Sequence, residues 1–524
     1  MYRRLKSGMH PYAPSLLLAS ILLVALGLRL WGIGFGLPNL YHPDEDAVLI
    51  PAITIVKTGD LEPTRMEYGT LHIYVLTAVS VVVFLISARN GYITTPEQLA
   101  VFERGTYPAV YAHPEYFLAA RATSALIGTA IVLLIYMLAR RLGNQRQAVM
   151  AAVLAAILPA LVTHAHFATP DTLLTFFSLL ALILLLRAYD NWERNTMWAY
   201  AGAGFVCGLA ASTKYNGVVL AFPLLLVPLL KVRQLDDLLS VRTLIGPLAM
   251  VAGFLAGTPY ALLNIPKFLF WVGYSLRLYN NPGAAPALPG WRWHLNYHVT
   301  SPNAPIFFLG LVGLLLSFRY WGRRGLLLNS FALLFWLAIL GQTRSEARMW
   351  LPTAPLFAIW AALILDVLLE RLSRRLPITE PRRKGVAILS LLVILPLLLN
   401  SVRISERFKR EDVRTQTQRW IEHNIPPDTK IAVEYFSPNL DPAVWPVTRE
   451  FHIYDKTIDW YQEQGIQYLV LSEAGNDPNK ISLEERATRA ALIERVCLVE
   501  TFKGSFLSAE TIHMWVYRVP PCEH

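Results

Sequence analysis

Residues 171–187 read DTLLTFFSLLALILLLR, with one charge at each end and a mostly apolar interior. A lipid bilayer gives the backbone no hydrogen-bond partner, so such a stretch must satisfy its own polar groups as a helix, and about 20 apolar residues suffice to cross. Ten further windows have the same character. The eleven predicted spans lie near 14–31, 122–139, 148–164, 171–187, 197–213, 216–230, 243–262, 304–318, 325–342, 350–369 and 385–401. The sequence therefore predicts a polytopic α-helical membrane protein.

The composition agrees with this class. Of the 524 residues, 54% are hydrophobic and 16% are charged, and the mean hydropathy is +0.39. Soluble domains carry about 25% charged residues, so a water-soluble enzyme of the ordinary kind is excluded. The net charge of +10 is first interpreted as cytoplasmic loop charge in a membrane protein, and we expect no nucleic-acid partner.

The distribution of basic residues predicts the orientation. With the N-terminus inside, the inner segments carry twenty lysines and arginines, whereas the short outer segments carry six. Because cytoplasmic loops hold the excess of positive charge, we expect a cytoplasmic N-terminus and, after eleven spans, an extracytoplasmic C-terminal part. The first span is not interpreted as a signal peptide, because no small-residue cleavage site precedes Trp31 and further spans follow.

Residues 71–88, LHIYVLTAVSVVVFLISA, are apolar enough to form another span. A span at this place would invert every later helix and move the twenty inner basic residues outside, against the charge rule. We therefore predict that 71–88 lies in or dips into the outer leaflet. It would then belong to a long outer loop with juxtamembrane helices over residues 32–121.

The chain changes character after residue 401. The stretch ERFKREDVRTQTQRWIEHNIPPDTKIAVE (406–434) is polar with helical periodicity, whereas IQYLVLSE (466–473) and TIHMWVYRV (511–519) are typical of strands. We therefore predict a transmembrane catalytic domain over residues 1–401 and a small extracytoplasmic α/β domain over 402–524. The latter has no glycine-rich phosphate loop, so no nucleotide site is expected in it.

Ionisable residues gather at the predicted outer ends of the spans, where a charge is less costly than in mid-membrane. In chain order they are Asp44, Glu45, Asp46, Glu67, Glu115, Asp171, Lys214, His294, His298, Arg344, Glu346 and Arg348. Simpler structural roles are open for each: Asp44 can begin a helix, Asp171 can cap one, and Lys214 can extend to the interface. Their joint occurrence favours a site on this side, because a proton-driven transporter places such groups near the midplane.

Several motifs in register resemble a known family. HPDE (42–45), directly after the first span, resembles the first-loop acidic motif of the GT-C class of integral-membrane glycosyltransferases. More narrowly, the chain resembles the dolichyl-phosphate-mannose protein mannosyltransferase and aminoarabinose-transferase superfamily, which is glycosyltransferase family 39-like. The further similar stretches, in the family's order, are TGDLEPTRMEYGTLHIYV (58–75), HFATPDTLLTFFSLLAL (166–182), GLAASTKYNG (208–217) and EARMWLPTAPLFAI (346–359).

The resemblance implies a GT-C-like fold and the transfer of a sugar from a polyprenyl-phosphate carrier, with inversion at the anomeric carbon. Asp44 matches the catalytic base, which takes the proton of the acceptor hydroxyl. The implied catalytic residues are Asp44, Glu45 and Asp171. The implied contacts to the carrier phosphate are Lys214, Arg348, Glu67, Tyr68 and Arg344. A divalent metal ion is an open alternative, with Glu67, Asp171, His294 and His298 as candidate ligands.

The expected partners are a polyprenyl-phosphate-sugar donor, the lipid bilayer of the plasma membrane, and an acceptor that can be a lipid, a glycan or a protein. Two other functions stay open. A transporter or flippase for lipid-linked sugars would have the same substrate chemistry, and discontinuous helices or inverted repeats would favour it. A scaffolding membrane subunit would tolerate the loss of Asp44.

Overall fold

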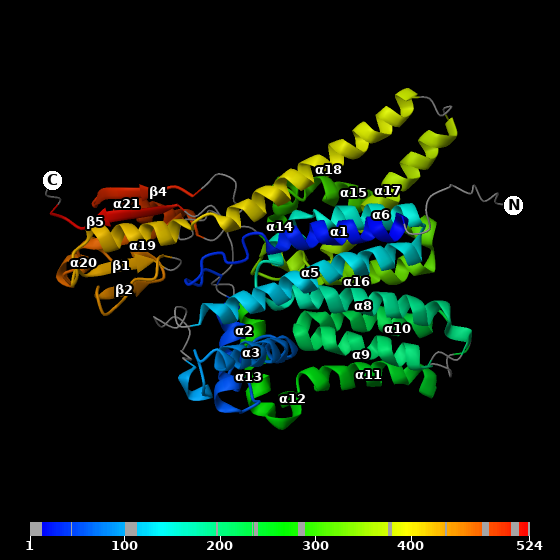
Figure 1. Cartoon of the computed structure of the whole chain (residues 1–524), viewed down its shortest axis with the longest axis horizontal. Coiled ribbons are helices and arrows are strands. Elements are labelled where there is room, and N and C mark those ends of the chain that lie inside the picture. Colours follow the sequence, from blue (N-terminus) through cyan, green and yellow to red (C-terminus); the bar gives the residue numbers. More distant parts are fainter. Residues whose placement is uncertain are drawn as a thin grey trace.

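The computed structural model describes residues 13–42, 44–99, 113–194, 197–232, 234, 239–280, 289–375, 380–434, 437–473, 481–504 and 513–521. A bundle of helices forms one end of the molecule and a small sheet domain the other (Figure 1). The long helix α18 (Glu380–Lys409) runs from the far side of the bundle toward the sheet (Figure 1). This helix passes residue 401, and the division of the chain at that residue stays a prediction.

The bundle is built from helices whose buried apolar faces form one core. Its helices are α1 (Ala13–Leu30), α5 (Pro114–Leu142), α6 (Gln145–Ala156), α7 (Pro159–His164), α8 (Pro170–Asp190), η2 (Trp192–Arg194), α9 (Met197–Thr213), η3 (Tyr215–Leu220), α10 (Ala221–Leu229), α11 (Val241–Gly257), α15 (Ala304–Trp321), α16 (Arg323–Leu340) and α17 (Ala354–Arg375). Helices α9 and α11 pack especially closely: Gly208 lies so near the carbonyl of Met250 that a Cβ at this position would collide with it. Small residues at such contacts are a common means of joining membrane helices.

Each predicted span contains a helix, and two of them are broken at prolines. The window 148–164 divides into α6 and α7, since Leu158 before Pro159 is extended (φ −74°, ψ 116°). The residue before a proline disfavours the helical region, which explains the break. The window 243–262 likewise divides before Pro259, which caps α12 (Tyr260–Leu263).

Five described helices are long and apolar enough to cross a membrane: α3 (Leu71–Arg89), α5, α8, α15 and α16. Several shorter apolar helices accompany them. The chain is mostly helical with multiple membrane-spanning candidates, and the count of eleven crossings stays a prediction.

A second, smaller core lies at the end of the bundle nearer the sheet. It joins α2 (Glu45–Thr58), α3 and the start of α5, and Figure 1 shows α2, α3 and α13 grouped at this end. The remaining elements of the region are η1 (Pro96–Gln98), α13 (Ile265–Asn280), α14 (Gly290–Thr300) and η6 (Ala347–Trp350). Only 22% of the apolar window of α3 is buried, and its path relative to the outer leaflet stays a prediction.

The C-terminal part forms a five-stranded sheet with the order β2-β1-β3-β5-β4. Its elements are α19 (Val413–Asn424), β1 (Ile431–Glu434), β2 (Val447–Glu450), η7 (Ile453–Asp455), α20 (Ile458–Glu463), β3 (Tyr468–Ser472), α21 (Leu483–Ile493), β4 (Cys497–Phe502) and β5 (Met514–Arg518). Strands β2, β1 and β3 are parallel, whereas β5 runs antiparallel to β3 and β4. The predicted small α/β unit is therefore present, with strands at both predicted places. Cys497 is disulfide-bonded, and Cys522 lies outside the described residues.

Candidate active site

Asp44 lies directly before α2, at the end of the bundle that faces the sheet. It is the N-cap of α2 without a side-chain cap hydrogen bond. Its carboxylate instead forms an ion pair with Arg348 of η6 and accepts a long hydrogen bond of 3.5 Å from the hydroxyl of Tyr68. The Asp44 backbone N–H donates to Nδ1 of His42 at 3.3 Å. The segment after the first predicted span and the turn after α16 therefore meet at this carboxylate.

Tyr68 connects Asp44 to a second charged pair. Its ring centroid lies 5.3 Å from Nζ of Lys214, and Lys214 donates to Oδ1 of Asp171 at 2.7 Å. Lys214 is the N-cap of η3, and Asp171 is in the first turn of α8. All four side chains are buried. Residues from four separate segments thus share one buried site.

Burial sets the charge states around these residues. Burial raises the pKa of Tyr68 well above its usual value, with a further contribution from Tyr279, so the phenol stays neutral. Burial alone would lower the pKa of Lys214, but the Asp171 carboxylate more than offsets it and the pKa is raised. Burial and the charge of Arg348 hold the pKa of His42 well below its usual value. The site therefore contains a neutral phenol, a neutral imidazole and a charged ammonium group.

Glu67 lies beside Tyr68 and is neutralised by a neighbour. Its Oε2 pairs with Nη2 of Arg65 at 2.6 Å. The next residue but one, Gly69, lies against the carbonyl of Ser212 at the end of α9, where a Cβ would collide. A glycine at this position lets the first loop lie directly on α9.

The turn after α16 contributes two arginines. Arg344 and Arg348 both pair with Glu346, and the backbone N–H of Arg344 donates to the carbonyl of Tyr279 at 3.2 Å. The Tyr279 ring, at the end of α13, lies 6.0 Å from the Arg344 guanidinium. Burial raises the pKa of Tyr279, which also interacts with the charge of Lys214. Tyr279 and Glu346 are therefore site residues outside the predicted catalytic and phosphate-binding sets.

Glu45 is adjacent to Asp44 but has different partners. Arg121 of α5 donates to both its oxygens, at 2.8 and 2.7 Å, and both side chains have no exposed surface. The Ala168 N–H donates to the same carboxylate at 2.9 Å. Arg121 also donates to the carbonyls of Ile33 and Phe35. Both Glu45 oxygens are thus used in connecting the start of α2 to α5, the loop after α1 and the turn before α8.

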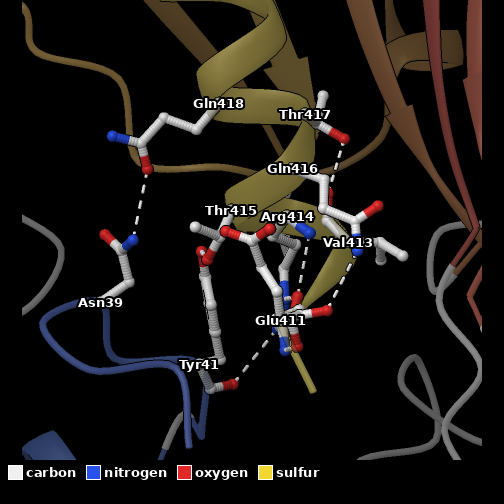
Figure 2. A network of polar contacts seen from close by, with 10 residues as sticks. Asn39, Tyr41, Glu411, Val413, Arg414, Thr415, Gln416, Thr417 and Gln418 are labelled. Carbon is white, nitrogen blue, oxygen red and sulfur yellow. Dashed lines mark hydrogen bonds and ion pairs between the residues drawn. The ribbon is translucent and has the colours of Figure 1, made fainter.

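The C-terminal part also contacts the segment that precedes Asp44. Figure 2 shows α19 facing this segment, with Asn39 donating to Gln418 at 3.2 Å and the Tyr41 hydroxyl 2.8 Å from that of Thr415. The guanidinium of Arg414 lies 3.8 Å from the Tyr41 ring centroid and donates to the Tyr41 carbonyl at 3.4 Å. Helix α19 therefore helps to position the loop that carries Asp44.

His294 and His298 lie in an aromatic cluster on α14. The Trp350 Nε1–H donates to Nδ1 of His294 at 2.7 Å, and the His298 ring stacks on Phe307 at 4.2 Å. Burial lowers the pKa of His294 to about 4 and that of His298 to about 3. Both histidines are therefore neutral near pH 7.

The four candidate metal ligands do not form one ligand set. Glu67 is paired with Arg65 and Asp171 with Lys214, and the two histidines pack among aromatic rings. Across the described parts of the chain, no group of three or more His, Cys, Asp or Glu side chains is placed to hold a metal ion. With these partners, the four side chains do not fit a divalent ion.

The chain resembles known proteins in sequence and in fold. Residues 91–274 match the family model "Dolichyl-phosphate-mannose-protein mannosyltransferase". No curated protein sequence matches the chain significantly.

Solved structures match over nearly the whole chain. The Archaeoglobus fulgidus oligosaccharyltransferase in its apo form is 15% identical with a TM-score of 0.56, covering 98% of this chain and 75% of that one. ArnT from Cupriavidus metallidurans bound to undecaprenyl phosphate is 14% identical with a TM-score of 0.55, covering 98% of this chain and 99% of that one. The Archaeoglobus fulgidus AglB in complex with an inhibitory peptide and a dolichol-phosphate is 15% identical with a TM-score of 0.54, covering 88% and 70%. The chain is therefore a multi-pass membrane protein with the fold of the GT-C-class glycosyltransferases, and the predicted resemblance to the dolichyl-phosphate-mannose protein mannosyltransferase family is confirmed through residues 91–274.

Proposed function

We propose that this protein is a membrane glycosyltransferase that moves a sugar from a polyprenyl phosphate to an acceptor hydroxyl on the outer face. One observation carries the proposal: the buried Asp44 carboxylate lies in one site with the cations Arg348 and Lys214. A base and cations for a phosphate are the groups that such a transfer requires. Support also comes from structural neighbours whose structures hold undecaprenyl phosphate or a dolichol-phosphate.

In the proposed reaction, the acceptor oxygen attacks the anomeric carbon from the face opposite the phosphate. The new C–O bond forms as the bond between that carbon and the phosphate oxygen breaks, which inverts the configuration. Asp44 takes the proton of the acceptor hydroxyl, and the carrier phosphate leaves with the bonding electron pair. Since the phosphate leaves as a stable anion, no strong general acid is needed.

The cations have a defined task in this scheme. The leaving phosphate gains one negative charge, and Arg348 and Lys214 are proposed to stabilise it. An arginine offers a planar pair of donors that suits phosphate oxygens, whereas a lysine acts as a point charge. Tyr68, whose hydroxyl reaches Asp44 and whose ring reaches Lys214, is proposed to hold the base and the cation in register.

Glu45 receives a positioning role in this proposal rather than a catalytic one. Both its oxygens accept hydrogen bonds from Arg121, so a transferred proton would break a buried ion pair. Its contacts instead fix the start of α2, and with it the direction of Asp44.

The outer-face location is a further part of the proposal. It is supported by the excess of basic residues at the opposite ends of the helices and by the disulfide at Cys497, because disulfides persist in oxidising compartments. The acceptor can be a lipid, a glycan or a protein.

The test is transfer by the purified full chain, with polyprenyl-phosphate sugars as donors and cell-envelope lipids, glycans and peptides as acceptors. Asp44→Asn is expected to lower the transfer rate by about 10²–10⁴-fold, the usual contribution of a general base. Asp60→Asn, a change in an exposed acid of the same outer loop, is the matched control and should keep the rate. Unchanged transfer by Asp44→Asn would remove the base assignment. Movement of lipid-linked sugar across vesicles without transfer to any acceptor would favour the flippase alternative.

A further inference from the structure

A cavity opens at the end of the bundle opposite Asp44. Its volume is about 310 Å³, and its lining residues are Leu142, Tyr189, Tyr320, Trp321, Arg323 and Arg324. They belong to the ends of α5, α8 and α15 and to the start of α16. Helix α8 begins next to Asp171 in the proposed active site and ends next to this cavity. The two sites are therefore separated by the length of a helix that is able to cross the membrane.

The surroundings of the cavity are strongly basic. Arg141 and Arg324 share the carboxylate of Asp190, at 2.9 and 2.8 Å, and Lys231 lies 4.1 Å from the ring centroid of Tyr189. Together with Arg323, these four cations and one carboxylate give a formal charge of +3. A concave, partly apolar site with this charge favours an anion.

The hydrogen-bonding groups of the lining also suit an anion. Within the described part of the chain, Arg324 donates from Nε to Asp190 at 2.8 Å, and Arg323 makes a long 3.4 Å contact to the Leu230 carbonyl. Helix α16 begins at Arg323, and its N-cap Gly322 supplies no side-chain acceptor for the first N–H groups. Arginine side chains and N-terminal amide groups are both suited to phosphate oxygens.

The aromatic residues indicate that this site lies at a membrane surface. Tyr320 is 48% exposed beside the buried Trp321, at the end of an apolar helix. Tyrosine and tryptophan are enriched at the level of lipid headgroups, where one end of the side chain is apolar and the other is wet. A phosphate bound at this level would have acyl chains beside it, along the exposed apolar faces of the helices.

We propose that this cavity binds the phosphate of an anionic phospholipid headgroup, in the leaflet opposite the proposed active site. Basic pockets between membrane helices bind headgroups of this class on the cytoplasmic side. This site is independent of the sugar transfer proposed above, so the failure of either proposal leaves the other intact.

The test measures lipid binding to the full-length protein by native mass spectrometry in detergent. The probes are phosphatidylglycerol, phosphatidylcholine and inorganic phosphate. We expect the protein to retain phosphatidylglycerol over phosphatidylcholine, and Arg323→Gln to weaken that retention about fivefold, the effect of one basic residue near a lipid surface. The double variant with Arg324→Gln should weaken it further.

Arg319→Gln is the matched control. Arg319 is an exposed basic residue on the last turn of α15 that does not line the cavity, so its loss should leave retention unchanged. Equal weakening by Arg319→Gln would overturn the site, because it would indicate unspecific attraction to basic residues. Equal retention of the two lipids would also overturn it, and displacement of phosphatidylglycerol by millimolar inorganic phosphate would overturn the lipid assignment. Thermal unfolding of each variant verifies that the fold is kept.

Discussion

Arg121→Leu removes the cation that neutralises Glu45 beside the proposed active site. The two side chains form a two-pronged ion pair, at 2.8 and 2.7 Å, with no exposed surface on either partner. Breaking a buried pair from one side leaves an uncompensated charge and costs about 3–5 kcal/mol. Arg121→Leu also removes donors to the carbonyls of Ile33 and Phe35, so we expect a value toward the upper end of this range.

Glu45→Gln should be milder, because the amide oxygen can still accept the N–H of Ala168. Glu45→Gln leaves the Arg121 charge with carbonyl partners only. We expect this variant to lower the free energy of unfolding by about 2 kcal/mol, the scale of one charge-assisted hydrogen bond. The double variant Glu45→Gln/Arg121→Leu removes both charges and should recover much of the loss, because no unpaired charge is then left buried. The coupling between the two sites is therefore expected to exceed about 2 kcal/mol.

The assay is unfolding in detergent micelles by a graded denaturant, followed by tryptophan fluorescence, with transfer measured on the same samples. A change below about 1 kcal/mol for Arg121→Leu would refute the reasoning, because exposed pairs contribute no more than this. A double variant as unstable as the sum of its parts would refute it as well. If Glu45→Gln keeps full stability yet loses transfer by about 10²-fold or more, Glu45 is catalytic as the sequence motif implied.

Three further outcomes are expected. Arg414→Ala should lower the turnover rate about tenfold with little change in donor KM, because the stacked cation on Tyr41 is worth about 1–2 kcal/mol when desolvated. Arg414→Lys should recover part of the rate. Hydrogen exchange over residues 36–44 should rise in the alanine variant. The double variant Lys214→Met/Asp171→Asn should restore the stability that Lys214→Met alone loses. If the Lys214 ammonium group binds the carrier phosphate, the double variant should still lack sugar transfer. Recovered transfer would contradict that role. The free energy of unfolding should fall as the pH drops from about 6.5 toward 4, because His298 binds a proton in the unfolded chain but stays neutral in the folded protein, where its pKa is about 3. His298→Phe should make this fall smaller in thermal melts recorded over the same pH range.

Helix positions could be predicted because apolar windows reflect local sequence. The break between α6 and α7 could also have been predicted, since Pro159 restricts Leu158 before it. The path of residues 71–88 is harder to predict from the sequence, because the same apolar composition suits a membrane span and a helix that packs on α2 at one end of the bundle. Composition measures affinity for lipid, whereas the path of the chain depends on contacts far away in sequence.

The candidate site shows the same limit. That Asp44, Asp171, Lys214 and Arg348 lie close together follows from one physical condition, which is that charges collect at one end of the spans. Their pairing does not follow from it. The sequence offers no local signal that Arg348 binds Asp44, or that Tyr279 closes the site, because each pairing joins segments that are far apart in the chain.

The pairing itself suggests how donor and base are coupled. Arg344, Arg348 and Lys214 face the carboxylates of Glu346, Asp44 and Asp171, so the charged groups of the site balance. A carboxylate held by a guanidinium accepts a proton poorly, because protonation breaks the pair. In the proposed reaction, a donor phosphate would compete for the same cations, and Arg348 is the one that pairs with two carboxylates. Turning Arg348 from Asp44 toward the phosphate would keep it neutralised by Glu346 and expose the Asp44 carboxylate to the acceptor. In this scheme, Asp44 would accept a proton only when the donor phosphate is bound.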